Sequence, residues 1–265
     1  MNSVALLLVL AAAAFHAGWN RLLHDTEERV AAMAIAGLTG CFLLSPTIVH
    51  SPPLHAGWLI PLSAVAEAAY ALALTTAYRH GALSLAYPIG RGTAPLLVTL
   101  GGWFVLSQHP SPLEIAGAAA LGLGLVVVAT AGKHPDRRIA IGFAVLTGCC
   151  IATYSLIDAR AVQSTFPPAY LGAVLGLEGL LLIGWLRGDW KRLRAALKPG
   201  IIIGAGTIGS YLLVLFAFQR ANAGPVATLR EVSVLLGLVL ARDKPGPRAW
   251  LGGTLVVAGA ILAAV

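Results

Sequence analysis

The sequence predicts an all-α integral membrane protein with ten transmembrane helices in two inverted five-helix repeats. The first observation is composition: 58% of the 265 residues are hydrophobic and only 11% are charged, whereas a soluble domain carries about 25% charged residues. The second is that the apolar residues fall into ten segments of membrane-spanning length. The third is that the two halves of the chain share motifs in the same order.

Net charge and cysteine content exclude several other classes. A net charge of +7 would favour nucleic acid as a partner of a soluble protein. Here almost all Lys and Arg residues lie between apolar segments, where they set topology. We therefore expect a lipid bilayer as surroundings and no nucleic acid. Cys41, Cys149 and Cys150 lie in apolar runs without a CxxC spacing, so we expect no disulfide framework, no metal site and no cofactor.

Ten candidate spans follow when the chain is divided at its charge, proline and glycine clusters, because about 20 apolar residues cross a bilayer as a helix. They are residues 3–23, 30–49, 57–78, 82–107, 112–131, 139–158, 168–186, 200–219, 224–241 and 248–265. The first segment resembles the apolar region of a signal peptide, but no positive residues precede it and its apolar run continues to Leu23. It is therefore predicted to be a spanning helix.

The most polar linker, residues 133–137, separates a first five-helix repeat (1–132) from a second (138–265). The motif "AYRHGALSLAYPIGRGTAPLL" ends the third span and starts the fourth, and "AFQRANAGPVATLREVSVLLG" does the same for the eighth and ninth. Because five is an odd number of spans, the second repeat must be inverted relative to the first. That plan is typical of secondary transporters.

The distribution of Lys and Arg predicts the orientation in the membrane. Fourteen of the 18 lie at the loops that follow the odd-numbered spans, whereas the opposite face carries only Arg160 and Arg220. The positive-inside rule places the fourteen in the cytoplasm and both termini outside.

Enzyme motifs give no support for catalysis. The stretch from Gly204 to Gly209 matches GxGxxG, but it continues into apolar spans, so its glycines are interpreted as close-packing faces between helices. The sequence contains no HExxH, P-loop or GxSxG motif. We expect a protein that is not an enzyme.

Ionisable residues within the spans mark the candidate site. Glu67, Arg91, Glu178, Arg230 and Glu231 lie in apolar segments, where an ionised side chain costs about 2.5–3.5 kcal/mol and needs a partner or a watery cavity. One expectation is that Glu67 pairs with Arg91 and Glu178 with Arg230, which would pin helices together. The other, favoured for the arginines, is that they line a cavity, because Pro and Gly residues interrupt the helix at Arg91 and at the matching place before Arg230.

The stretch "AFHAGWN" places polar side chains in the first span. His16, Trp19 and Asn20 share one helical stripe. Because lipid tolerates His and Asn poorly, this stripe is expected to face the bundle interior. Two interpretations stay open: the stripe forms a cavity wall together with Tyr87 and Tyr154, or His16 and Asn20 merely hydrogen-bond neighbouring helices.

Four motifs carry a resemblance to a known family: "AFHAGWN", "SLIDAR", "AYPIGRGTAPLL" and above all "LREVSVLLG". They resemble motifs of the drug/metabolite transporter superfamily, in its ten-helix EamA-type branch. The resemblance implies two inverted repeats, a central cavity, a bacterial inner (plasma) membrane, and export or exchange of small metabolites such as amino acids. It also implies cytoplasmic termini, opposite to the charge count, and a longer ninth span than residues 224–241.

The leading hypothesis is a secondary transporter of small organic solutes, amino-acid-like or carboxylate-bearing. Arg91 and Arg230 would attract the carboxylate through their guanidinium groups, and Glu67, Glu178 or Glu231 would carry a proton. One alternative is proton-coupled efflux of lipophilic cations held by Glu67 or Glu178, and another is a membrane scaffold subunit without transport activity. Ten helices suffice to enclose a site in one chain, so a monomer is sufficient and a homodimer stays open.

Overall fold

The computed structural model describes residues 3–130, 137–240 and 246–264, and every regular element in these residues is a helix. Seven of the described helices are long and apolar enough to cross a membrane. They are α1 (Ser3–Asp25), α2 (Arg29–His50), α3 (Leu59–His80), α4 (Leu83–Leu106), α6 (Arg137–Ala161), α7 (Pro167–Trp185) and α9 (Leu197–Phe218). The prediction of an all-α multi-pass membrane protein is confirmed.

The remaining helices are shorter. Two are apolar helices near the ends of the two halves, α5 (Pro112–Ala129) and α12 (Pro247–Ala264). The predicted span 224–241 is divided into α10 (Ala223–Leu229), the 3₁₀ turn η2 (Arg230–Val232) and α11 (Ser233–Leu240). Two short pieces, η1 (Leu54–Ala56) and α8 (Trp190–Ala195), lie between longer helices. The number of ten spans therefore remains a prediction.

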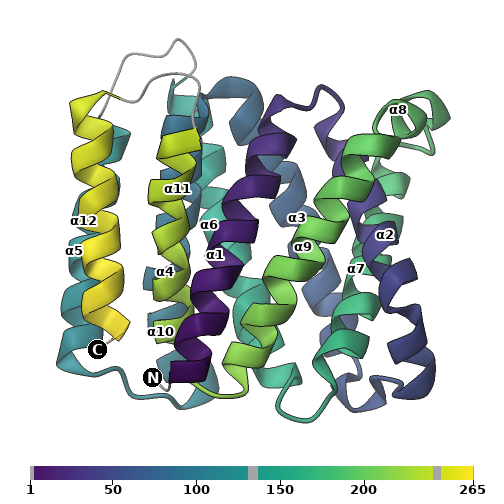
Figure 1. The fold of residues 1–265 in the computed structure, drawn as a ribbon, viewed down its shortest axis with the longest axis horizontal. Coiled ribbons are helices and arrows are strands. Elements are labelled where there is room, and N and C mark those ends of the chain that lie inside the picture. The colour runs from purple at the N-terminus through teal and green to yellow at the C-terminus, as the bar shows by residue number, and fades with distance from the viewer. Residues whose placement is uncertain (1–2, 131–136, 241–245, 265) are drawn as a thin grey trace.

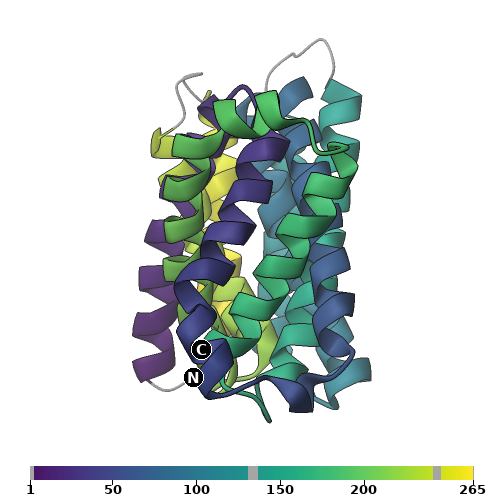
Figure 2. The ribbon, with the colours of Figure 1, turned by 90° about the vertical axis from the view of Figure 1, so that its right-hand side faces the viewer.

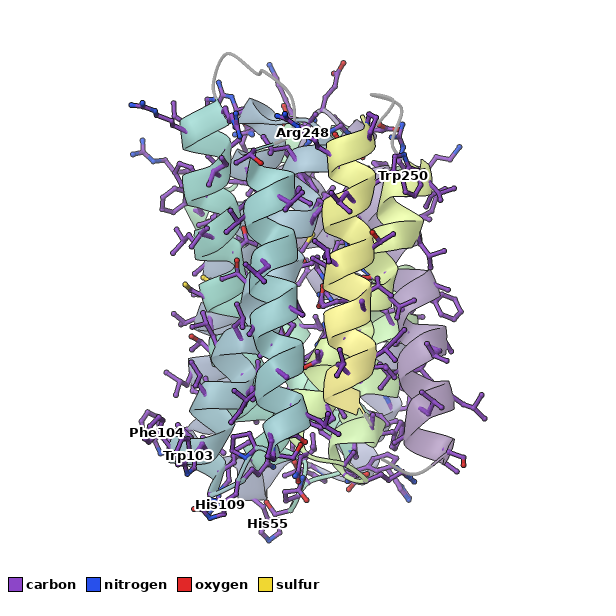
Figure 3. All side chains as sticks on the ribbon, turned by 90° about the vertical axis from the view of Figure 1, so that its left-hand side faces the viewer. His55, Trp103, Phe104, His109, Arg248 and Trp250 are labelled. Carbon is purple, nitrogen blue, oxygen red and sulfur yellow. The ribbon has the colours of Figure 1, made fainter. Side chains whose placement is uncertain are left out.

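The helices stand side by side as a bundle whose loops lie at its two ends (Figures 1 and 2). Both ends of the drawn chain lie at one end of the bundle, and α8 lies at the other (Figure 1). Figure 3 shows Arg248 and Trp250 at the α8 end, and His55 and His109 at the end where the termini lie.

The most extensive helix contacts join the first half of the chain to the second. Helix α2 packs on α7, α5 on α12, α3 and α4 on α6, and α1 on α9. Because lipid tails are as apolar as the helices themselves, the hydrophobic effect does not drive such pairs together inside a membrane. Close packing and polar contacts must hold them.

Glycines bring two of these pairs to backbone contact. A Cβ atom added at Gly37 of α2 would lie 2.6 Å from the carbonyl oxygen of Leu175 in α7. Between α5 and α12, a Cβ atom added at Gly124 or at Gly252 would lie 2.7 Å from the carbonyl oxygen of the other. Any side chain at these positions would force the helices apart, which is the reason for small residues at helix interfaces in membranes.

The glycines of the GxGxxG match have the same role. In α9, a Cβ atom added at Gly204 would lie 2.8 Å from the carbonyl oxygen of Ala36, and one added at Gly206 would lie 3.0 Å from Cβ of Trp19. The interpretation of these glycines as close-packing faces is confirmed.

We predict that Gly37→Ala lowers the free energy of unfolding by about 1–3 kcal/mol, because the new methyl group must push α2 away from α7. Gly142→Ala in α6 is the matched control. A Cβ atom there meets nothing within 4 Å, and alanine is favoured over glycine inside a helix by about 1 kcal/mol. Unfolding of both variants in detergent micelles measures the difference, and equal stability of the two would contradict this account of the interface.

Candidate functional site

A small cavity lies between helices of both halves. Its volume is about 30 Å³, which is room for one or two water molecules and too little for a metabolite. The lining comes from α1, α2, α3, α6, α7 and α9: His16, Trp19, Met33, Glu67, Tyr70, Tyr154, Glu178, Thr207, Ser210 and Tyr211. A solute can enter this cavity only if the surrounding helices move apart.

Two carboxyl groups face this cavity, one from each half of the chain. Glu67 of α3 is 7% exposed and Glu178 of α7 is 2% exposed. Both residues line the same cavity, and the Oε1 atom of each has no hydrogen-bonding partner among the described residues. The expected pairs of Glu67 with Arg91 and of Glu178 with Arg230 are therefore wrong: the helices bring the two acids together instead.

The polar stripe of α1 is buried, as expected for a stripe that faces the bundle interior. Trp19 Nε1 donates to Ser210 Oγ of α9 at 3.3 Å. Asn20 donates through Nδ2 to the His16 carbonyl oxygen at 3.0 Å and accepts from the Tyr78 hydroxyl at 2.9 Å. His16 and Trp19 line the cavity, whereas Asn20 hydrogen-bonds a neighbouring helix. The stripe thus contains both of the arrangements that the sequence left open.

Aromatic rings form a continuous wall of the cavity. The rings of Tyr70 and Tyr154 meet edge to face at 5.7 Å, and those of Tyr154 and Tyr211 at 5.6 Å. Electron-rich ring faces attract organic cations. Tyr154 was a candidate from the sequence, but Tyr70 and Tyr211 were not. The helical spacing of Tyr70 from Glu67 could have indicated Tyr70, whereas no local pattern distinguishes Tyr211 from an ordinary tyrosine in an apolar span.

Asp158 is the centre of a hydrogen-bond cluster that joins four helices. Its Oδ1 atom in α6 accepts from Ser63 Oγ of α3 at 2.6 Å and from the Tyr170 hydroxyl of α7 at 2.6 Å. Its Oδ2 atom accepts from the Tyr211 hydroxyl of α9. Hydrogen bonds to a charged acceptor contribute about 1.5–3 kcal/mol each. Asp158 is the last residue of the predicted span 139–158, and nothing in the sequence indicates this role.

The buried arginine of α4 pairs with a glutamate of η2. Arg91 Nη2 lies 3.0 Å from Glu231 Oε1, and both side chains are almost inaccessible to solvent. When the two repeat motifs are written in register from Ala77 and Ala217, Arg91 and Glu231 occupy the same place. Equivalent residues of opposite charge thus meet, whereas the sequence had matched Arg91 with Arg230.

The backbone around this ion pair differs between the halves. Helix α4 runs without interruption through Pro88 and Pro95. In the second half, the helix is interrupted by the 3₁₀ turn η2, which contains Arg230 and Glu231. The expected interruption is therefore present near Arg230 and absent near Arg91. A 3₁₀ turn in the middle of a helix often marks a functional hinge.

Arg230 has no ion-pair partner among the described residues. Its guanidinium carbon lies 5.5 Å from the centre of the Tyr211 ring, and its Nη2 atom, like Nε and Nη1 of Arg91, lacks a hydrogen-bonding partner in the described part of the chain. Both arginines and Tyr87 are buried outside the cavity lining. The candidate residues thus form one group that lines the cavity and a second group, with Arg91, Arg230 and Tyr87, that is buried outside it. Tyr211 connects the two groups, because it lines the cavity, stacks with Arg230 and donates to Asp158.

Two larger hollows lie at opposite ends of the bundle. One, of about 310 Å³, is lined by the loop between α1 and α2, the end of α3 and Arg192 of α8. The other, of about 300 Å³, is lined by the ends of α4, α6 and α9, including Arg160 and Arg220. Along α6, Tyr154 lines the cavity, and Ala159 and Arg160 line the second hollow. Asp158 lies between these positions in the same helix.

Comparison with known families defines the class of protein. Residues 138–265 match the EamA-like transporter family. The resemblance of the chain to the drug/metabolite transporter superfamily is thereby confirmed, and the family match covers its second half. A membrane transporter of small molecules is the function that this family suggests.

Comparison with solved structures supports the fold over nearly the whole chain. A crystal structure, described only as that of a protein, matches with a TM-score of 0.69 and covers 99% of this chain and 97% of its own. The two sequences are 16% identical, so this likeness shows the fold alone. No curated protein matches the sequence.

We predict that Arg91→Glu and Glu231→Arg, made singly, each lower the free energy of unfolding by about 3–5 kcal/mol, because each places two like charges together in the bundle. The double variant restores opposite charges and is expected to recover most of that loss. Unfolding midpoints in detergent measure the coupling. Arg230→Gln serves as the control, since it removes a buried arginine without breaking an ion pair, and additive losses in the double variant would refute the pairing.

Proposed function

We propose that the protein is a secondary transporter of small organic solutes in a bacterial inner (plasma) membrane, and that it works by alternating access around the central cavity. The observation that carries the proposal is the cavity itself, which combines aromatic walls with two carboxyl groups whose Oε1 atoms have no hydrogen-bonding partner among the described residues, and which takes its lining from both halves of the chain. The match of the second half to a transporter family supports it. The cavity volume of about 30 Å³ means that the surrounding helices would have to move apart to admit a solute.

We further propose ten spans in two inverted repeats, residues 1–132 and 138–265, joined by the linker 133–137. The helix contacts support this, because α2 packs on its counterpart α7, α5 packs on its counterpart α12, and the contact of α1 with α9 corresponds to that of α6 with α3. The ion pair between the equivalent residues Arg91 and Glu231 lies where a two-fold axis between the repeats would pass. By the Lys and Arg distribution, the α8 end faces the cytoplasm and both termini face outward.

Alternating access requires two gates, and the polar clusters supply candidates. The hydroxyl groups of Ser63, Tyr170 and Tyr211 tie Asp158 to three other helices on the side of the 300 Å³ hollow. On the other side, the Tyr78 hydroxyl joins α3 to Asn20 of α1. Hydrogen bonds of this kind open at modest cost when water replaces the partner. Each cluster would open in turn to admit solute from one end.

The lining of the cavity favours a solute with a cationic nitrogen. Glu67 and Glu178 offer unpaired carboxyl oxygen atoms, and Tyr70, Tyr154 and Tyr211 offer ring faces that attract cations. Amino-acid-like solutes fit this arrangement with the ammonium group at the two acids. Their carboxylate would then approach Arg230, whose guanidinium group lies against the Tyr211 ring and whose Nη2 atom has no hydrogen-bonding partner among the described residues.

Efflux of lipophilic cations is the second candidate. Its support is that Arg91 is already paired with Glu231 and that neither arginine lines the cavity. A purely cationic solute would need Glu67 and Glu178 but no guanidinium group. One chain contains the complete cavity, so a monomer suffices for either solute.

We predict that Glu67→Gln reduces transport by about tenfold or more, because the solute loses a hydrogen bond to a charged group. The measurement is the current from reconstituted protein on a solid-supported membrane, tested with amino acids, organic acids and organic cations. Glu114→Gln, at the exposed start of α5, is the control and should retain full activity.

Arg91→Gln and Arg230→Gln distinguish the two solute classes in the same assay. Loss of current with amino acids in Arg230→Gln supports the amino-acid-like solute, whereas unchanged currents with organic cations support the second candidate. If neither a current nor counterflow of labelled solute is found for any compound, the transporter proposal fails and a scaffold subunit becomes the better explanation.

Proton coupling follows from the balance of buried charges. Two arginines, Arg91 and Arg230, are buried with four carboxyl groups, so at most two of these groups are balanced by arginine. Glu231 is paired with Arg91, and Asp158 accepts three hydroxyl hydrogen bonds. Glu67 and Glu178 have neither an ion pair of this kind nor such hydroxyl donors among the described residues. Two adjacent unbalanced carboxylates are costly away from water, so we propose that both hold protons in the empty state.

We predict that a proton gradient drives solute accumulation in proteoliposomes of the unaltered protein, and that Glu178→Gln abolishes this accumulation while solute counterflow persists. The glutamine keeps the shape of the side chain but cannot release a proton, so exchange is uncoupled from the gradient. Accumulation by Glu178→Gln at the rate of the unaltered protein would exclude this glutamate as the coupling group.

A further inference from the structure

An unpaired basic cluster lies at the end of the bundle where α7, α8 and α9 meet. We use the name basic cluster for Arg187, Lys191, Arg194 and Lys198, which are all exposed and which form no ion pair among the described residues. Asp189 supplies the one acidic side chain of this segment, but its carboxylate caps α8 by accepting from the backbone N–H groups of Lys191 and Arg192. Four positive charges therefore face outward without compensation.

Large apolar side chains are exposed beside these charges. Trp185 is 67% exposed, Trp190 is 75% exposed and Leu197 is 49% exposed, whereas Leu193 is the apolar residue with which α8 packs onto the protein. Tryptophan at the end of a spanning helix prefers the level of the lipid headgroups, where its ring is apolar and its N–H is hydrated. The segment thus combines an apolar surface and a positively charged surface at the depth of the membrane interface.

The position of α8 suits contact with a leaflet surface. The helix lies at one end of the bundle, beyond the spanning helices and at its periphery (Figures 1 and 2). Arg192, which also belongs to α8, donates through Nε to Glu28 Oε2 at 2.6 Å, and both residues line the 310 Å³ hollow. A ligand that holds α8 in place also holds one wall of this hollow.

We propose that the basic cluster is a binding site for the headgroups of anionic phospholipids. The lipid phosphate accepts hydrogen bonds from Lys and Arg side chains, and Trp190 and Leu197 contact the apolar part of the same lipid. Each Lys or Arg of the cluster that lies near the bound headgroup adds to the attraction, so the affinity increases with the number of charges in the cluster, whereas charges elsewhere at the same end are too far from this headgroup to contribute as much. Free phosphate carries the charge but has no apolar part, so it cannot make the apolar contacts that a lipid makes with the exposed tryptophans.

The test is the affinity of the purified full-length protein for phosphatidylglycerol in neutral detergent, measured by native mass spectrometry during titration. Three substitutions made together, Lys191→Gln, Arg194→Gln and Lys198→Gln, are expected to weaken binding on the order of 100-fold. A matched control removes three charges elsewhere at the same end of the bundle, through Arg79→Gln, Arg138→Gln and Arg248→Gln. We expect this control to bind phosphatidylglycerol within about threefold of the unaltered protein.

Three results would overturn the proposal. An equal loss in the control variant would mean that net charge, and not this cluster, attracts the lipid. Equal affinity for phosphatidylcholine would mean that the headgroup charge plays no part. If the protein binds inorganic phosphate as tightly as it binds phosphatidylglycerol, the cluster is a phosphate site and not a lipid site. Thermal unfolding of both triple variants verifies that each remains folded during the titrations.

Discussion

A buried polar group in a membrane protein is costly when it has no partner, because the surrounding lipid supplies none, and the whole bundle is organised by this constraint. Three of the buried ionisable groups, Arg91, Glu231 and Asp158, have partners on other helices and in the other half of the chain. Arg91 of α4 meets Glu231 of η2, and Asp158 of α6 accepts from α3, α7 and α9. These contacts supply the attraction between helices that the hydrophobic effect cannot supply in lipid.

The bundle contains two kinds of helix interface: some are built from small residues and others from polar residues, and they lie in different parts of the bundle. Glycines such as Gly37 and Gly252 bring α2 to α7 and α5 to α12 at backbone contact. Around the cavity, large side chains such as Tyr154 and Tyr211 keep the helices further apart and leave room for hydrogen-bonded groups. Close backbone packing at the glycine interfaces leaves little space for rearrangement, whereas hydroxyl and carboxyl groups can exchange one partner for another or for water. Motion is therefore expected at the polar layer, with the glycine interfaces as rigid supports.

Tyr211 connects the parts of the site that must act together. Its ring lines the cavity and lies against Arg230, and its hydroxyl group donates to Asp158. A solute that displaces this ring changes the surroundings of a buried arginine and of the Asp158 cluster at the same time. The 3₁₀ turn that contains Arg230 lies beside it, and a 3₁₀ turn within a helix often marks a functional hinge.

The sequence alone determined the all-α membrane class, the approximate limits of the long helices, the buried face of α1 and the family, because apolar length, helical spacing and motifs are local properties. Only the tertiary structure decided which charges meet. The sequence suggested Glu67 with Arg91, yet Arg91 lies against Glu231, and Glu67 shares a cavity with Glu178. Such pairs depend on the rotation and depth of each helix relative to its neighbours, and these are set by packing between segments far apart in the chain, which no local pattern encodes.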